Sequence, residues 1–562
     1  MTNQLFNISQ TNLAKLSKLF ELDFDQAGNL RTLSSKENQF QSKTIHQKQI
    51  DQNTAMKLSK WFLSKKIIEQ VFNISSFKLK LLECTRFAFG YRITFKQFAQ
   101  NQSDLLPVLG GAIHIMINHN GKIISVSSTI QQGTISRSSV LQTSKIKALA
   151  IAKNKCGKTI VATKSEFVLV CRGNNLQPAY KIMLTCKFPY YKHTYLISAI
   201  TGEIIDVFAK ERCCFINNKT SEIKASAIVN TPDPNIPISD QVSKVIIKGL
   251  PNNQILKDEH FEMFTGIFAK AVSAKDDNTY CYGPRDSQFA AVSIYLALKK
   301  QIELYLSLGL KQPAQPMFVF VDNPLVRDNA YFDPQRYEIY IGVGSGVKHG
   351  GLAKHIAFDL GVANHEFGHA TVALQTVGDD LMGKAGAAIH EAVADVLGAL
   401  TMDYLGKIQQ AKNDGKPYTA NDLKNDPRII GKYALPPFGI RSQKNNKRTP
   451  DDLTGEPHAD GLIIGGALAD LLVAMATKSK CANLEKQIKQ FVQIILMALA
   501  LLPGYRVTFS DLLRCVLTAD KEICQSKHKA IIEKCFGDHG IVLNTMTNLD
   551  RCTLLNKLVV CS

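Results

Sequence analysis

Two histidines four residues apart, with a glutamate directly after the first, are the residues of this sequence best suited to chemistry. His365, Glu366 and His369 lie in a segment, Ile356–Leu374, whose apolar residues recur at spacings of three and four, as on one face of a helix. The two histidines then project from one side, one turn of about 5.4 Å apart. Such a pair can bind one small cation, and zinc prefers imidazole nitrogens at about 2.0–2.1 Å. Glu366 is rotated about 100° from His365, so it can address a water at the metal rather than the metal itself.

A second apolar helix is predicted downstream, over Ala387–Leu400, and it carries two carboxylates. Glu391 and Asp395 are four residues apart and share a face of that helix. Carboxylates in so apolar a helix are costly unless they are paired or bound to metal. We therefore predict Glu391 as the third metal ligand and Asp395 as the acceptor of the remaining ring N–H of a liganding histidine. The alternative is a pair of ordinary core helices whose histidines bond to backbone carbonyls.

The sequence His-Glu-Phe-Gly-His over residues 365–369, followed by Ala-Ile-His-Glu-Ala-Val-Ala-Asp-Val-Leu-Gly over residues 388–398, resembles the gluzincin metallopeptidases, specifically the thermolysin and fungalysin clans. The resemblance implies an α+β fold in which a β-rich lobe and a helical lobe flank an active-site helix. It implies a zinc-dependent endopeptidase with one zinc per chain and with Glu366 as general base. It also implies a preference for a hydrophobic residue just after the cut bond, in a pocket to which Val362 contributes.

Two segments upstream resemble the edge strand with which thermolysin-like enzymes hold the substrate backbone. They are Asp328–Phe332 and Tyr340–Gly346. The resemblance implies substrate-binding roles for Asn329 and Ala330.

The same resemblance assigns two residues further along the chain. The segment Gly455–Leu468 is similar to the loop and helix that carry the family's transition-state histidine. This implies that His458 donates a hydrogen bond to the tetrahedral oxyanion, and the alternative is an exposed loop histidine. Arg441 is the candidate for the family's substrate-carbonyl arginine, and Arg448 is its rival.

The sequence also departs from the family. No tyrosine occurs between residues 370 and 390, where family members often carry one that assists oxyanion binding. Met402 and Gly361 stand where calcium-binding acids are expected, so calcium is not predicted. His390 takes a position usually held by asparagine, and its side chain is expected either to line the cleft or to lie on the surface.

The first 210 residues are predicted to be α+β with hairpins. Strands over Ala112–Asn118 and Lys122–Val126 flank Asn120-Gly121, the strongest short hairpin signal, in which both turn positions need positive φ. A second hairpin turns at Thr201-Gly202, and Ser144–Lys153 is helix-like.

This amino-terminal part is similar to the family's pro-region, with a fungalysin/thermolysin propeptide motif in about residues 60–135 and a PepSY-like part in about residues 140–210. We therefore predict a propeptide-like region over residues 1–210, a β-rich peptidase lobe over 211–350, and the active-site helix with a helical lobe over 351–562. The resemblance implies a zymogen whose propeptide is an intramolecular inhibitor. Cleavage between Ala209 and about Glu222 is our hypothesis.

Composition limits the remaining possibilities. The chain has 562 residues, a formal net charge of +19, 45% hydrophobic residues and 20% charged residues, which excludes a largely disordered chain. The lysines are spread out and no nucleic-acid-binding signature occurs, so the expected partners are protein or peptide substrates and not nucleic acid. No apolar run reaches the 18 or more residues of a membrane span.

The sequence defines less about the localisation of the protein and the redox state of its cysteines. The amino terminus lacks the features of a secretory signal, whereas the resemblance favours secretion or export, so the localisation is left open. Thirteen cysteines without a Cys-x-x-Cys pair give no support to a Cys-type zinc site. Free buried thiols are expected, with disulfides among the last five cysteines as the alternative.

Two rival functions are weighed against the peptidase. A zinc-binding pseudo-peptidase that serves as an interaction protein is favoured by the missing tyrosine and opposed by the intact Glu366 and ligand set. An unrelated basic binding protein with a chance motif would hold no stoichiometric zinc.

Overall fold

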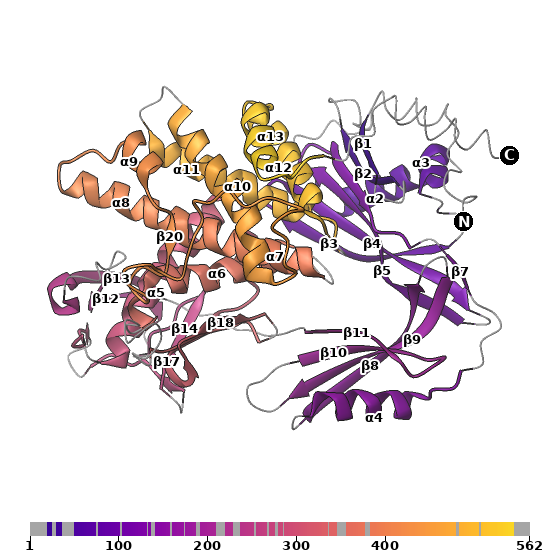
Figure 1. The fold of residues 1–562 in the computed structure, drawn as a ribbon, viewed down its shortest axis with the longest axis horizontal. Coiled ribbons are helices and arrows are strands. Elements are labelled where there is room, and N and C mark those ends of the chain that lie inside the picture. The colour runs from indigo at the N-terminus through magenta and orange to yellow at the C-terminus, as the bar shows by residue number, and fades with distance from the viewer. Residues whose placement is uncertain are drawn as a thin grey trace. The chain divides into compact units, whose positions relative to one another are not determined.

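The computed structural model divides the chain into two compact units of mixed α+β structure (Figure 1). Unit 1 comprises Met1–Ala209, Ala500–Thr518 and Val542–Ser562, and unit 2 comprises Lys210–Leu499 and Ala519–Ile541. The structure describes most of residues 20–543, and the gaps of five or more residues are 25–29, 36–49, 136–140, 187–191, 210–219, 229–236, 345–355 and 377–382. Most of the hypothetical cleavage segment after Ala209 therefore lies outside the described residues.

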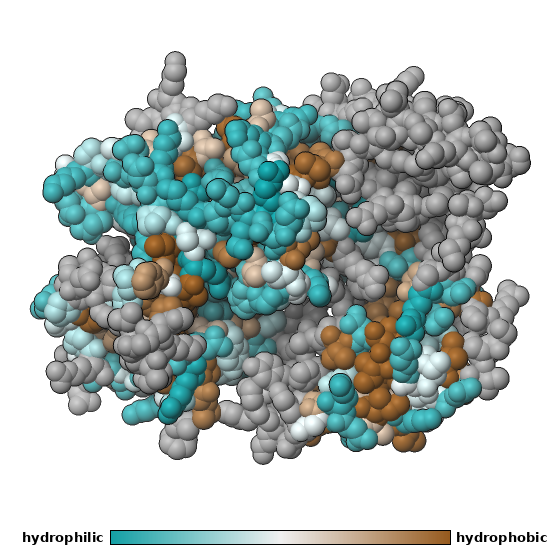
Figure 2. All heavy atoms as spheres, in the orientation of Figure 1, coloured by the Kyte–Doolittle hydropathy of each residue, from teal (hydrophilic) through white to brown (hydrophobic). Residues whose placement is uncertain are grey.

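Unit 1 is built on an eleven-stranded sheet with the order β1-β2-β6-β5-β8-β9-β10-β11, in which β3 and β4 extend from β5 and β7 pairs with β9. Helices α2 (Gln52–Leu63) and α4 (Lys145–Cys156) each add apolar side chains to a separate core of this unit. Figure 2 shows hydrophobic residues gathered over the strands β8–β11. The strands are β1 (Phe20–Phe24), β2 (Leu30–Ser35), β3 (Lys78–Phe87), β4 (Gly90–Asn101), β5 (Asp104–Asn118), β6 (Ile123–Ser128), β7 (Thr134–Ile135), β8 (Ile160–Arg172), β9 (Asn175–Cys186), β10 (Lys192–Ser198) and β11 (Ile204–Ala209), and a third helix is α3 (Lys66–Val71).

Both predicted hairpins are confirmed, with one correction to the first turn. Strands β5 and β6 pair across Asn120-Gly121, and β10 and β11 pair across Thr201-Gly202. Gly121 has a φ of 79°, but Asn120 is not in the left-handed region, so the expected pair of positive φ values is wrong. The Asn118 side chain accepts hydrogen bonds from the backbone of Asn120 and Lys122 and stabilises a longer turn that needs only one left-handed residue.

Two arginines of unit 1, one buried and one partly buried, bind the segment 500–511 of the same unit. Arg92 is 2% exposed, and its guanidinium donates to the carbonyl oxygens of Ala500 at 2.9 Å and Leu502 at 3.0 Å. Arg31 makes a two-pronged ion pair with Asp511, with both N–O distances 2.9 Å. Residues 500–518 are thus an integral part of the unit that contains the first 209 residues.

The described residues of unit 2 form a three-stranded sheet, a five-stranded sheet, a two-stranded ribbon and a set of helices. The first sheet has the order β13-β12-β16, and the second has the order β15-β14-β17-β19-β18, in which β14, β17 and β19 run parallel and β18 lies antiparallel at the edge. Within the stretch 211–350 that was predicted to be β-rich, strands β12–β19 are interrupted by one long helix, α5 (Ser287–Leu308). The strands are β12 (Thr220–Ala227), β13 (Ser243–Pro251), β14 (Phe261–Thr265), β15 (Lys270–Ala271), β16 (Thr279–Tyr280), β17 (Met317–Arg327), β18 (Ala330–Asp333), β19 (Glu338–Val343), β20 (Ile429–Ile430) and β21 (Arg441–Ser442).

The predicted helical pattern after residue 350 is also confirmed. The helices are η2 (Ile238–Gln241), α5 (Ser287–Leu308), η3 (Ile356–Phe358), α6 (Leu360–Gln375), α7 (Lys384–Val393), η4 (Ala394–Leu400), α8 (Thr401–Asn413), α9 (Ala420–Asn425), α10 (Pro457–Lys478), α11 (Leu484–Leu501), α12 (Phe509–Cys524) and α13 (Lys529–Asp538). Among the described residues, one helical stretch, Pro457–Thr477 of α10, is long and apolar enough to span a membrane. Of its apolar window, 78% is buried inside the protein, as expected for a core helix.

Two glycines let the helix α6 approach the segment η4 closely. A Cβ atom on Gly368 would lie 2.6 Å from Ala394 Cα, and one on Gly398 would lie 2.5 Å from the carbonyl oxygen of Asn364. The segment η4 is a π-helical turn between α7 and α8, whereas the sequence predicted an ordinary helix over Ala387–Leu400. Such wide turns are frequent at functional sites, and this one carries Asp395 toward α6.

A buried carboxylate fixes the start of α6. Asp359 is its N-cap and accepts hydrogen bonds from the backbone of Gly361 and Val362. It also accepts hydrogen bonds, both at 2.9 Å, from the backbone of Tyr433 and Ala434. One side chain therefore joins the helix to the loop between β20 and β21. Burial raises the pKa of Asp359, and the four N–H groups partly offset that effect.

We predict that Asp359→Ala lowers the free energy of unfolding by about 2–4 kcal/mol, because it removes a helix cap and leaves buried N–H groups without an acceptor. Denaturant unfolding of the full chain checks this. Asp414→Ala, at an exposed position, is the matched control and should change stability by no more than about 0.5 kcal/mol. Equal stability of the two variants would contradict the role given to Asp359.

Candidate metal centre and adjoining cavity

Two imidazoles and one carboxylate converge between α6 and α7. The ligand atoms of His365, His369 and Glu391 all lie within 4.8 Å of one another. His365 Nε2 is 3.7 Å from Glu391 Oε2, and His369 Nε2 is 3.5 Å from Glu391 Oε1. These distances are too long for hydrogen bonds but are close to the separation of about 3.3–3.5 Å between ligands around a tetrahedral zinc ion. The donor types and their spacing suit a small divalent cation.

Asp395 is the centre of a buried network behind these ligands. His365 Nδ1 lies 2.8 Å from Asp395 Oδ1. Arg441 donates to both carboxylate oxygens, from Nε at 2.7 Å and from Nη2 at 2.8 Å, and the Gln443 amide donates at 2.6 Å. The structure thus brings Asp395 to the His365 ring, and it adds two partners that sequence reasoning had not connected to it.

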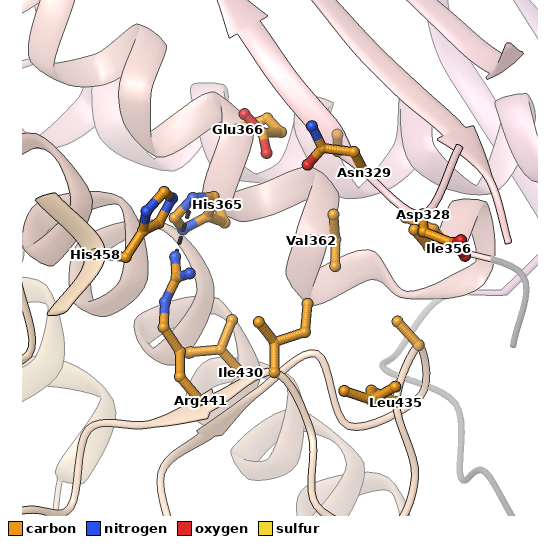
Figure 3. Close-up of a pocket in the computed structure, with 13 residues that line it drawn as sticks. Asp328, Asn329, Ile356, Val362, His365, Glu366, Ile430, Leu435, Arg441 and His458 are labelled. Carbon is orange, nitrogen blue, oxygen red and sulfur yellow. Dashed lines mark hydrogen bonds between the residues drawn. The ribbon is translucent and has the colours of Figure 1, made fainter. Parts of the chain in front are cut away.

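Arg441 also reaches the ligand cluster itself. Its Nη2 atom donates to Glu391 Oε2 at 3.1 Å and lies 3.4 Å from His365 Nε2 (Figure 3). The guanidinium therefore neutralises Asp395 and faces the cavity at the same time. Its rival Arg448 is exposed and does not line this cavity.

The helix α6 presents Glu366 to a cavity of about 360 Å³. Glu366 is buried, and its Oε2 atom has no hydrogen-bond partner. Burial, and to a lesser degree the Glu391 carboxylate, raise the pKa of Glu366 to about 7, while His365 and Arg441 act in the opposite direction. A carboxylate in this setting can accept and return a proton near neutral pH. The cavity is lined by Asp328, Asn329, Ala330, Ile356, Val362, His365, Glu366, Ile430, Ala434, Leu435, Ile440, Arg441 and His458.

His458 enters the cavity from the first turn of α10. Its Nε2 atom lies 3.5 Å from Glu391 Oε1, and Glu456 Oε1 is 2.7 Å from its Nδ1 atom. The side chain is 56% exposed, so His458 is both an open residue and one that faces the ligand cluster. Glu456 orients the ring, and its position two residues before His458 was the signal that sequence reasoning missed.

The predicted substrate-binding residues line the cavity together with an apolar wall. Figure 3 shows Asn329 on the strand side, Val362 on α6, and Ile430 and Leu435 on the opposite side. Ile430 and Arg441 are cross-strand partners in the short ribbon β20–β21. Sequence reasoning missed Ile430 and Leu435 because isolated apolar residues in a Pro- and Gly-rich stretch carry no periodic signal.

His390 was expected either to line the cleft or to lie on the surface, and it is instead partly buried against His369. Its Nδ1 atom lies 3.3 Å from His369 Nδ1, so it contacts the nitrogen of His369 that faces away from Glu391. It is not among the residues that line the cavity.

Burial and charge act differently on the two imidazoles. Burial, reinforced by neighbouring imidazoles and Arg441, lowers the pKa of His369 well below its ordinary value. Burial also opposes protonation of His365, but the Asp395 carboxylate outweighs it and the net effect raises the pKa. The pKa of Asp395 is lowered, since Arg441 and His365 outweigh its burial.

Comparison with known proteins adds little. No family model matches the sequence, and no curated protein matches it. Ten chains of solved structures match, among them the C-terminal domain of YpeB from Bacillus megaterium, with 18% identity over 32% of this chain and 71% of that chain and a TM-score of 0.20. That likeness carries no argument about this chain.

The Asp395–Arg441 pair predicts strong energetic coupling. Asp395→Ala and Arg441→Met should each lower the free energy of unfolding by about 2–4 kcal/mol, because each leaves a buried charge without its partner. The double variant should lose clearly less than the sum, because no charge of the pair is left behind. Unfolding of all four proteins measures the cycle, and additivity to within about 0.5 kcal/mol would contradict the coupling.

Proposed function

We propose that the protein is a zinc-dependent endopeptidase made as a zymogen, with a thermolysin-like pair of lobes around α6. One observation carries the proposal: the cluster His365–His369–Glu391 adjoins a cavity into which Glu366 and His458 both face. A cation site next to a buried carboxylate and a hydrogen-bond donor is the arrangement that metal-assisted hydrolysis needs.

The residues fit a zinc ion by number, type and spacing. His365, His369 and Glu391 would hold it and leave a position open toward the cavity, as in catalytic rather than structural sites. When bound, zinc would supply an acidified water and polarise a carbonyl oxygen. Asp395 orients the His365 ring, which is the usual second layer around such ligands.

The remaining roles belong to side chains of the chain itself. Glu366 takes a proton from the attacking water at its unpartnered Oε2 and passes it to the leaving amine. His458, oriented by Glu456, donates a hydrogen bond where the oxyanion develops. Asn329, directly before the edge strand β18, and Ala330, the first residue of that strand, hold the substrate backbone. Arg441 binds a substrate carbonyl from the opposite wall.

The apolar wall accounts for the expected specificity. Val362, Ile430, Leu435 and Ile440 all line the cavity, and together they favour a hydrophobic substrate side chain, since burial of such a side chain contributes about 1.5–3 kcal/mol. We assign this pocket to the residue just after the cut bond.

The second candidate function is a zinc-binding pseudo-peptidase that acts as an interaction protein. The absence of a tyrosine between residues 370 and 390 favours it, because the oxyanion then has one hydrogen-bond donor fewer. The active enzyme is favoured by Glu366, whose Oε2 atom has no hydrogen-bond partner and is free to accept a proton.

Hydrolysis of a casein-type substrate by the full chain separates these functions. Glu366→Gln should bind zinc like the wild type and lose about 10²–10⁴-fold in rate, because only the proton acceptor changes. Glu303→Gln, an exposed acid on α5, is the matched control and should retain the wild-type rate. A chelator should abolish hydrolysis, and His369→Ala should lose one equivalent of zinc.

Two outcomes would contradict the peptidase. Equal zinc in wild type and Glu366→Gln without hydrolysis from either, even after processing near residue 215, would favour the pseudo-peptidase. Equal zinc content in wild type and His369→Ala would contradict the proposed metal centre itself.

The zymogen proposal has its own test, because residues 500–518 belong to the same unit as residues 1–209. Active material should show a new amino terminus between residues 209 and 222. The two fragments should still elute together near the 62.2 kDa of the intact chain, since Arg92 and Arg31 bind the segment Ala500–Asp511. Amino-terminal sequencing and gel filtration check both points, and fully active material of intact mass would refute the cleavage.

A further inference from the structure

A second cluster of metal-ligand types lies in unit 2, at the junction of α12 and α13. Asp520 and Cys524 are four residues apart on α12, and His528 directly precedes α13. Their ligand atoms all lie within 4.8 Å of one another. None of the three belongs to the cavity or the ligand set described above.

The turn between the two helices brings His528 back to Asp520. Gln525 and Ser526 both adopt left-handed backbone conformations, with φ of 54° and 62°, which non-glycine residues adopt uncommonly. The backbone N–H of His528 then donates to Asp520 Oδ2 at 3.0 Å. This hydrogen bond uses the Oδ2 atom of Asp520 and leaves its Oδ1 atom without a partner.

Two buried polar atoms of the cluster lack any hydrogen-bond partner. They are Asp520 Oδ1 and His528 Nε2. The two residues are 0% and 4% exposed, so water does not compensate for the missing contacts. A buried polar atom without a partner is energetically unfavourable, and a bound cation would satisfy both atoms.

We propose that Asp520, Cys524 and His528 bind a divalent cation of the zinc type. A carboxylate oxygen, a thiolate and an imidazole are all zinc ligands, and a thiolate with an imidazole selects zinc over magnesium or calcium. Zinc ligands stand about 3.3–3.8 Å apart in a tetrahedral site, and the three ligand atoms here lie within 4.8 Å of one another. The partly exposed Cys524 provides the entry path.

A cation here has a structural role. All three ligands come from residues 520–528, so the ion would tie the end of α12 to the start of α13 and stabilise the left-handed turn between them. The fourth position is left for water. This site is independent of the proposed peptidase, because it shares no residue with that centre.

Cobalt substitution of the metal-free full chain tests the proposal. Bound Co²⁺ should give a thiolate-to-cobalt charge-transfer band, which the His365–His369–Glu391 centre cannot produce because it contains no sulfur. Cys524→Ala and His528→Gln should each lose the band and one equivalent of bound cobalt. Cys535→Ala, a buried free cysteine on α13, is the matched control and should keep both.

The proposal is tested separately from the peptidase by Glu391→Gln. This variant should keep the band while it loses the other metal, and zinc should raise its melting temperature. Absence of the band from the wild type, or its persistence in Cys524→Ala, would overturn the second site whatever the outcome of the hydrolysis assay. Circular dichroism of each variant verifies that the loss of cobalt is not a loss of folding.

Discussion

The site depends on how closely α6 approaches η4. At the contact, Gly368 and Gly398 have no side chain, and backbone atoms of Ala394 and Asn364 occupy the space that a Cβ would need. Any larger residue at these positions would push the helices apart. The distances between His365 and its partners Glu391 and Asp395 would then grow together. The two glycines therefore set the spacing of this side-chain cluster.

Charge is the second constraint on this centre. Asp395, Glu391 and Arg441 lie together with two imidazoles in a largely buried region, where an unpaired charge costs several kcal/mol. The bidentate pair Arg441–Asp395 satisfies that requirement and ties the ribbon β20–β21 to η4. Asp359 ties the following loop to the start of α6. The cavity wall and the ligand helix are therefore held by the same polar contacts.

The fold of unit 1 depends on contacts with residues far away in the sequence. Its buried Arg92 donates to carbonyl oxygens at residues 500 and 502, beside the end of a helix, where a cation is favoured. The first 209 residues thus complete their own fold with a segment translated near the end of the chain. These contacts join the first 209 residues to residues 500–518 within one compact unit.

The sequence alone determined what depends on local spacing. The four-residue interval put His365 and His369 on one helix face, and Asn120-Gly121 specified a hairpin, although the Asn118 side chain selected a turn other than the one predicted. Tertiary structure decided what depends on distant segments. Ile430 and Gln443 carry no periodic signal, and only packing brings them to the cavity and to Asp395. At the second cluster, the spacing of Asp520 and Cys524 is visible in the sequence. The return of His528 is not, because it rests on two left-handed residues that the sequence Gln525-Ser526 does not announce.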